Sequence, residues 1–198
     1  MRKRMWWLVL WACLAPAARA QDVELFGGYS YLSVNGAKLE SVGLNGWNAE
    51  VSVGRKSWSA VADFSNHYGV SEFHFTPIGN GGHGATFLFG PQYSLREVRH
   101  VTPFVHALVG TAHGVRYTWT LGGEYFPYSI ASEMAFAMAF GGGIDVKVRD
   151  HIWIRPVQVD YIQQNFTSSA IHSARFSAGI VFRFGGGEKN GQLSEVNR

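Results

Sequence analysis

The strongest constraint on this sequence is a strict alternation of apolar and polar residues within segments of about ten residues. The segment that ends at Phe184 shows it most regularly. One set of alternate positions is entirely apolar: Ala174, Phe176, Ala178, Ile180, Phe182 and Phe184. The other set is mainly polar or small: Arg175, Ser177, Gly179, Val181 and Arg183. Because side chains of a β-strand point alternately to its two faces, this pattern predicts a strand with one face toward lipid and one toward a polar interior.

Weaker versions of the alternation occur in seven further segments. They lie at about Val23–Leu32, Trp47–Gly54, Trp58–Ser65, Thr86–Leu95, Thr102–Ala112, Met134–Val146 and His151–Gln163. In the segment before Lys147, large residues alternate with Ala and Gly, which suits the narrow interior of a small barrel. The sequence therefore predicts eight strands, each about long enough to cross a membrane.

The connections between these segments alternate between short and long. The short ones are Gly54–Ser57, Arg96–Val101 and Val148–His151. The longer ones are Ser33–Gly46, Asn66–His83, Gly114–Ala131 and the intermediate Asn165–Ile171. Outer-membrane barrels have short periplasmic turns and longer external loops. We therefore predict an all-β, eight-stranded antiparallel up-and-down transmembrane β-barrel with both termini periplasmic and its loops extracellular, the Gly79–Gly84 stretch being a flexible loop.

The seventh segment breaks the alternation. The parity of Val157, Val159 and Tyr161, continued backwards, places Arg155 on the lipid face. A bulge at Pro156, which cannot donate a ladder hydrogen bond, restores the phase. An arginine that snorkels to the membrane interface is the alternative.

The amino terminus has the features of a secretory signal peptide. A basic start, Met1–Arg4, precedes the apolar run Met5–Leu14 and an Ala18-Arg19-Ala20 cleavage site. We predict cleavage after Ala20, a barrel over residues 21–184 and a short periplasmic tail over residues 185–198. The single cysteine, Cys13, lies inside the signal, where the neighbouring Trp11 argues against a lipoprotein site. The mature chain then has no cysteine and no disulfide.

The basic balance of the whole chain disappears once the signal is removed. Four of the 17 Lys and Arg residues (Arg2, Lys3, Arg4 and Arg19) lie in the signal, whereas all 14 acidic residues remain, so the mature balance is 13 − 14 = −1. This removes the electrostatic case for nucleic-acid binding.

Three motifs resemble a known group of proteins: Phe26–Tyr31 (FGGYSY), Gly141–Asp145 (GGGID) and the closing Ser177–Phe184 (SAGIVFRF). The sequence resembles the small outer-membrane barrels of the OmpA transmembrane-domain and OmpX type, often described as porin-family or outer-membrane β-barrel domain proteins. The resemblance implies a Gram-negative outer membrane, surrounding lipid as a partner, and recognition of the aromatic Phe184 by the barrel-assembly machinery. The tail after Phe184 departs from that group and is too short for a peptidoglycan-binding domain.

Charged and polar residues occupy the predicted inward positions. They are Glu24, Glu50, Asp63, His106, Asp145, Asp160, Arg175 and Arg183. Buried charges need partners, and eight strands leave an interior just wide enough for side chains. We therefore predict a salt-bridged interior polar network, with a narrow low-conductance pore as an alternative.

Five histidines are predicted to lie near the external loops: His67, His74, His83, His113 and His172. They have neither ligand spacing nor an accompanying carboxylate cluster, and a zinc site needs three or four converging ligands. We predict no metal and no other cofactor.

The sequence offers one combination of residues for catalysis, Ser132 with His113 and Glu133, which could meet near one rim. No nucleophile-elbow motif surrounds Ser132, so we predict no enzyme, with a membrane-embedded lipid-modifying enzyme resembling a lipid A deacylase as the alternative. A soluble ligand carrier of the lipocalin type requires an apolar interior, which the inward Arg175 and Arg183 oppose.

The Gly114–Ala131 segment is the richest of the loops in aromatic residues. They are Tyr117, Trp119, Tyr125, Phe126 and Tyr128. The structural interpretation is a hairpin that extends the barrel, with these aromatic rings in the girdle at the membrane interface. The functional interpretation is a contact surface for an extracellular ligand or cell surface. The predicted role is therefore structural, adhesive or surface-interacting, exerted through the external loops.

Overall fold

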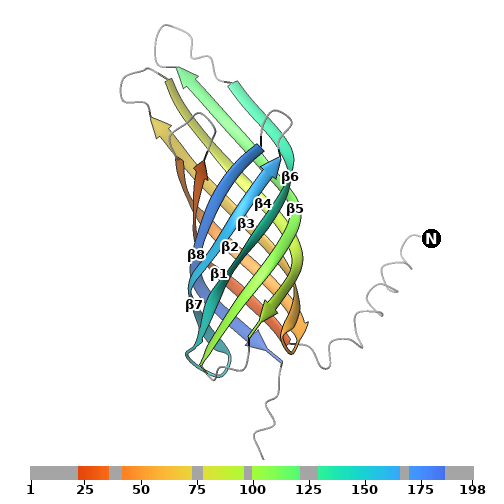
Figure 1. The fold of residues 1–198 in the computed structure, drawn as a ribbon. Helices are drawn as coiled ribbons and strands as arrows, with labels where there is room; N and C mark the ends of the chain where they lie inside the picture. The colour runs from red at the N-terminus through yellow and green to blue at the C-terminus, as the bar shows by residue number, and fades with distance from the viewer. Residues whose placement is uncertain are drawn as a thin grey trace, which may run out of the picture.

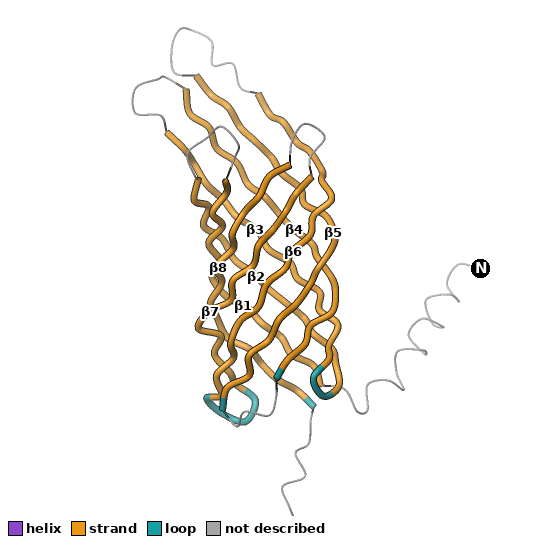
Figure 2. Tube along the Cα trace, in the orientation of Figure 1, coloured by secondary structure: helices purple, strands orange, loops and turns teal. Residues whose placement is uncertain are grey.

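The protein forms a closed barrel of eight antiparallel strands in a computed structural model, shown in Figures 1 and 2. The structure describes residues 22–35, 42–72, 78–95, 100–120, 129–165 and 170–185. The strands are β1 (Asp22–Asn35), β2 (Val42–Arg55), β3 (Trp58–Glu72), β4 (Ile78–Ser94), β5 (Val101–Thr120), β6 (Ser129–Lys147), β7 (Ile152–Asn165) and β8 (Ala170–Phe184). Each strand pairs with its neighbours in sequence, and β1 pairs with β8 to close the sheet. The predicted fold class and strand order are confirmed, whereas the signal peptide and tail lie outside the described residues.

The alternation of faces follows the sequence pattern. In β8, Phe176, Ile180 and Phe182 remain 43–47% exposed on the outside, whereas Arg175 and Val181 are completely buried in the interior. A side chain that alternation places outside has no protein layer to cover it, so the exposed apolar residues are those that contact lipid in a membrane barrel.

The outward face carries an apolar band between two aromatic margins. Trp58 packs edge-on against Tyr93 near the short turns, with ring centroids 5.0 Å apart, and Tyr68 lies against His83 at the other end. On β4 the two margins are 93 − 83 = 10 residues apart. A tilted strand of that length spans roughly 25 Å, the height of the apolar band of an outer-membrane barrel. No helix in the described residues is long and apolar enough to cross a membrane.

The strands are longer than the sequence predicted. β5 has 20 residues and β6 has 19, so the predicted loops Asn66–His83 and Gly114–Ala131 are largely strand at both ends. The predicted loops Ser33–Gly46 and Asn165–Ile171 also lose residues to the adjoining strands. The prediction of a flexible loop at Gly79–Gly84 is wrong, because these residues pair with β3 on one side and β5 on the other. Glycine lacks intrinsic strand propensity, but ladder bonds on both sides override it.

Four strands continue past the rest of the barrel. Pairing extends to Glu72↔Gly79 between β3 and β4, to Ile78↔Thr120 between β4 and β5, and to Thr118↔Ser129 between β5 and β6. The pairing of β6 with β7 begins only at Phe136↔Asn165. Figure 1 shows β4, β5 and β6 rising beyond β7 and β8. Within the described residues, Ser129–Ala135 therefore pairs only with β5 and forms an open edge, which we call the β6 edge.

A bulge in β7 determines which of its residues face inward. The register shifts between Arg155 and Gln158 against β8, and at the same place against β6, so β7 carries one extra residue around Pro156. Arg155 is consequently buried (2% exposed), whereas Ile154 is 45% exposed. The predicted bulge is confirmed, and the alternative of a snorkelling Arg155 is wrong.

Candidate functional site

The middle of the barrel interior is occupied by a guanidinium held between two carboxylates. Arg175 on β8 binds Asp63 of β3 with both terminal nitrogens, at 2.9 and 2.8 Å. Its Nε donates to Asp160 of β7 at 2.9 Å, and all three side chains are fully buried. The bidentate geometry is the strongest form of charge-assisted hydrogen bond, so this cluster ties three strands together.

A second cluster surrounds Arg155 nearer the short turns. Its Nη1 lies 2.7 Å from Glu50 Oε2, and its Nε donates to Asp145 Oδ1 at 2.7 Å. The guanidinium also stacks between the rings of Phe26 and Phe104, at 4.4 and 4.2 Å from their centroids. The alternation of Val157, Val159 and Tyr161, continued backwards along β7, places Arg155 on the lipid face. Pro156 was the only feature of the sequence that predicted a bulge and so an inward Arg155.

Gln158 joins the two clusters. Its amide nitrogen donates to Glu50 Oε1 at 2.7 Å and to Asp160 Oδ2 at 3.0 Å, while its oxygen accepts from Arg155 at 2.7 Å. His106 Nε2 lies 2.7 Å from the other oxygen of Asp160. Gln158 faces inward by the regular alternation of β7, whereas Arg155 reaches the interior only because of the bulge, and the two side chains then meet.

The network continues to the end of the barrel that holds the termini. Arg183 lies 3.0 Å from Glu24 and 2.8 Å from Asp145, and its guanidinium covers the ring of Trp153 at 3.9 Å. The structure thus brings together all eight residues that the sequence placed inside, Glu24, Glu50, Asp63, His106, Asp145, Asp160, Arg175 and Arg183, and adds Arg155 and Gln158. Five carboxylates and three guanidinium groups meet in one connected cluster.

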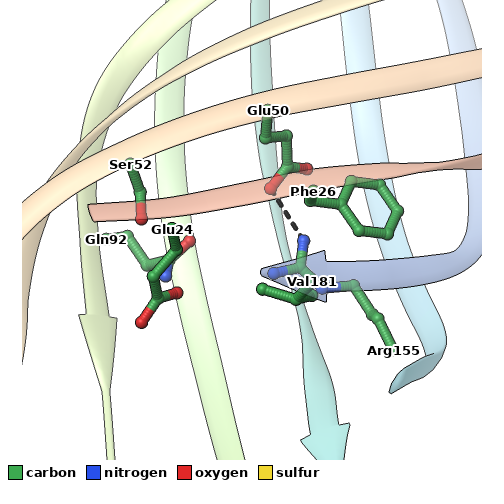
Figure 3. Close-up of a pocket in the computed structure, with 7 residues that line it drawn as sticks. All are labelled: Glu24, Phe26, Glu50, Ser52, Gln92, Arg155 and Val181. Atoms are coloured by element: carbon green, nitrogen blue, oxygen red, sulfur yellow. Dashed lines mark hydrogen bonds and ion pairs between the residues drawn. The ribbon is translucent and has the colours of Figure 1, made fainter. Parts of the chain in front are cut away.

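The interior is filled rather than open. The gaps between the side chains beside Arg155 are too narrow for a water molecule. Figure 3 shows Arg155 and Glu50 joined among these side chains. The residues that line the gaps are Glu24, Phe26, Glu50, Ser52, Gln92, Arg155 and Val181. Apolar side chains, including Leu88, Leu108 and Ile162, form a further buried cluster inside the barrel. Paired charged side chains and buried apolar side chains together pack the described part of the barrel interior.

The histidines do not all lie near external loops as predicted. His67 is inside the barrel, 1% exposed, with its Nε2 2.9 Å from Ser30 Oγ. The prediction failed for His67 because β3 continues to Glu72, so Asn66 and His67 are strand residues. His83, His113 and His172 lie on strands with outward parity, and His74 lies outside the described residues. No group of three or more His, Cys, Asp or Glu side chains in the described ranges could hold a metal ion.

Two of the three residues that the sequence offered for catalysis are in contact. His113 Nε2 lies 3.0 Å from Ser132 Oγ on the outward face of β5 and β6. Glu133 has the inward parity of Ala135 and Ala137 in the same strand, so it does not share the outward face with the other two. The three residues therefore do not form the trio that the sequence suggested.

The aromatic residues chosen as a contact loop are distributed differently from the prediction. Tyr117 and Trp119 are strand residues of β5, paired with β4 and, for Tyr117, with β6. Tyr125, Phe126 and Tyr128 lie outside the described residues. The backbone on either side therefore extends the barrel, as in the first of the two interpretations that the sequence offered.

Comparison with known proteins shows the fold. Ail, the attachment invasion locus protein of Yersinia pestis, superimposes with a TM-score of 0.61 at 16% identity, over 83% of this chain and 99% of Ail. A second Ail structure, in complex with the heparin analogue sucrose octasulfate, gives the same TM-score and coverage at 15% identity. Neisserial surface protein A superimposes with a TM-score of 0.52 at 14% identity, over 83% of this chain and 97% of that one.

Sequence comparison gives nothing further, because no family model and no curated protein matches the chain. At these identities the structural likeness concerns the fold alone. The chain has the fold of the small eight-stranded outer-membrane β-barrels, as the sequence resemblance implied.

Proposed function

We propose that this protein is a bacterial outer-membrane barrel that acts by surface contact, through the end opposite its termini. The β6 edge carries the proposal. Backbone N–H and C=O groups on an open edge are available to pair with an extended polypeptide, and proteins commonly cover or shorten such edges. Here the edge is held seven residues beyond the last β6–β7 pair, on a sheet supported by three further strands.

The proposed orientation places both termini in the periplasm and the extended strands outside the cell. β1 begins and β8 ends at the same end of the barrel, together with the short turn at Lys56 and Ser57. In outer-membrane barrels the short turns are periplasmic. The names of the similar proteins, an attachment invasion locus protein and a surface protein, are consistent with a role in surface contact.

The interior is proposed to give rigidity rather than passage. Each guanidinium of the interior network pairs with carboxylates from other strands, so opening a path requires buried charges to separate. Planar-bilayer recordings of the purified barrel should therefore show no large, stable conductance. Such a conductance, unchanged when the extension is removed, would show that the interior is the working part.

Shortening the extension tests the contact role. Val115 pairs with Ser132, so residues 116–131 can be replaced by an Asn-Gly turn that closes β5 onto β6 below the tip. All pairs between β6 and β7 begin at Phe136 and are preserved. We expect bacteria that display the shortened protein to lose attachment to epithelial monolayers and to immobilised heparin, while the barrel still inserts.

The matched control replaces only residues 121–128, which connect β5 to β6, by the same Asn-Gly turn and keeps the β6 edge. Attachment that survives this change but not the longer deletion supports the edge as the contact surface. Equal attachment by all three proteins would refute the proposal.

Export and assembly are proposed on the sequence alone. Mature protein taken from outer membranes should begin at Gln21, whereas a lipidated start at Cys13 would overturn the cleavage site. The aromatic Phe184 at the end of β8 is the proposed assembly signal, read despite the tail that follows it.

A further inference from the structure

A serine and a histidine meet on the outside of the barrel, on the face that looks toward lipid. Ser132 Oγ and His113 Nε2 are 3.0 Å apart, and Ser132 is exposed. A hydroxyl within hydrogen-bond distance of an imidazole nitrogen is the arrangement that activates a serine as a nucleophile. The interior network does not use this pair. Ser132 belongs to the β6 edge, but the proposed contact role uses the backbone of that edge and not the serine hydroxyl.

The pair lies where the apolar band ends. Three successive outward rows cross β3, β4, β5 and β6 in register. From the band outward they read Phe64, Phe87, Thr111 and Phe136; then Asn66, Ala85, His113 and Met134; then Tyr68, His83, Val115 and Ser132. Aromatic and aliphatic side chains give way to polar ones across these rows. The ester carbonyls of membrane lipids lie at this same boundary between hydrocarbon and headgroups.

The β6 edge supplies a further element of such a site. Backbone N–H groups of successive strand residues point alternately to the two neighbouring strands. Ser132 and Glu133 both lie in Ser129–Ala135, which has β5 on one side and no described β7 partner on the other. Of two successive N–H groups, one therefore points to β5 and the other to the side on which no described strand pairs with these residues. A backbone N–H at or beside the nucleophile is a usual donor to the oxyanion of acyl transfer.

We propose that Ser132 and His113 form an acyl-transfer site for ester-linked acyl chains of the lipid leaflet at this end of the barrel. Ser132 Oγ attacks the ester carbonyl carbon and passes its proton to His113 Nε2. The lipid alkoxide leaves and takes that proton, so an acyl-serine remains and the lipid departs as an alcohol that lacks one acyl chain. Water, deprotonated by the same nitrogen, then releases the fatty acid and restores the hydroxyl.

The site is a dyad, and this sets its expected speed. By register, the outward neighbours of His113 are Ala85, Thr111, Val115 and Met134, none of which is a carboxylate. Without a carboxylate to orient the imidazole, turnover is slow, because triads that lose their acidic member retain only a small part of their rate. Covalent capture of the serine is therefore a more sensitive test than steady-state turnover.

The test is labelling of the folded barrel in detergent with a fluorophosphonate, which phosphonylates an activated serine. Mass spectrometry should locate the label at Ser132, S132A should abolish it, and H113Q should slow it by about 100-fold, the usual contribution of a general base. Heat-dependent gel migration confirms that each variant is folded. Wild-type protein that is folded but unlabelled at Ser132, or H113Q labelled as fast as wild type, would overturn the proposal.

The chain provides its own matched control. Ser30 Oγ lies 2.9 Å from His67 Nε2, an equivalent contact, but it is enclosed inside the barrel. Ser30 should remain unlabelled in the folded protein, and S30A should label at Ser132 as wild type does. Labelling of Ser30 would show that the probe reports any serine beside a histidine, which would also overturn the inference.

Measuring fatty-acid release from vesicles of different composition identifies the lipid substrate. Fatty-acid release from phospholipid vesicles, or from vesicles that contain lipopolysaccharide, should depend on Ser132 and should name the substrate. Absence of Ser132-dependent release from both would overturn the proposed substrate class. His113 lies on β5, outside the β6 edge, so H113Q should attach to epithelial monolayers as wild type does. Failure of this site is therefore distinguishable from failure of the contact role.

Discussion

At the scale of single residues, Arg155 is one of three interior guanidinium groups that each bind two carboxylates. Its guanidinium binds Glu50 and Asp145 and lies between two aromatic rings. R155A leaves the buried Glu50 without its cation and leaves Asp145 with Arg183 alone. Breaking a comparable buried pair costs about 3–5 kcal/mol. We expect a loss of that size in urea unfolding of the barrel in lipid vesicles.

The control for this prediction is R149A. Arg149 lies exposed in the turn between β6 and β7, so its replacement should change the free energy of unfolding by less than about 0.5 kcal/mol. Equal effects of the two variants would contradict the assignment of Arg155 to the interior.

Lys56 is a second residue whose effect on stability can be predicted, because its backbone conformation is strained. It has a φ of 58° in the turn between β2 and β3, a conformation that L-residues with a side chain avoid. K56G removes this strain but adds chain entropy to the unfolded state, so we expect a net gain of about 0.5 kcal/mol. S57G at the adjacent position has no such strain to relieve and should destabilise slightly. If both variants changed stability in the same direction, the strain would not be the cause.

At the scale of elements, the β7 bulge decides which side chains reach the interior. Deleting Pro156 removes the extra residue and inverts the parity of the strand before it, which moves Ile154 inward and Arg155 onto the lipid face. Arginine facing lipid costs about 2–4 kcal/mol near the midplane, in addition to the lost ion pairs. We expect the deletion variant to fail to fold into vesicles, as shown by loss of heat-dependent gel migration.

P156A is the matched control, because it keeps the strand length and so keeps the bulge. It should fold with nearly wild-type stability. A deletion variant that folds as well as P156A would show that the bulge is not needed to place Arg155.

At the scale of the whole molecule, the apolar band determines where the barrel sits in a bilayer. Phe89 lies midway between the aromatic margins of β4 and is 55% exposed, whereas His83 lies at one margin. F89R should reduce the free energy of unfolding in vesicles by about 2–4 kcal/mol, and H83R by about 0–1 kcal/mol. The loss of stability should be larger for F89R than for H83R. A larger loss for H83R would show that the apolar band lies elsewhere on the barrel.

The sequence by itself determined the strand number, the order of strands and the two faces of most strands. These properties depend on local alternation, which is visible within ten residues: Phe182 and Arg183 are adjacent and must face opposite ways in any strand. The eight interior candidates followed from the same rule. Ser132 and His113 lie at the two ends of the predicted loop Gly114–Ala131, so the sequence suggested only that they could meet near one rim.

Only the tertiary structure decided which charges pair, how far the strands run and where the alternation slips. Arg155 reaches Glu50 across 105 residues of sequence, and Arg175 reaches Asp63 across 112. Such pairs depend on the register with which the barrel closes. His67 lies inside because β3 continues through a stretch whose polar and glycine residues resemble a loop, and pairing with both neighbours holds it there. Local pattern records which face a side chain occupies, whereas register, bulges and strand ends are set by hydrogen bonds between distant strands.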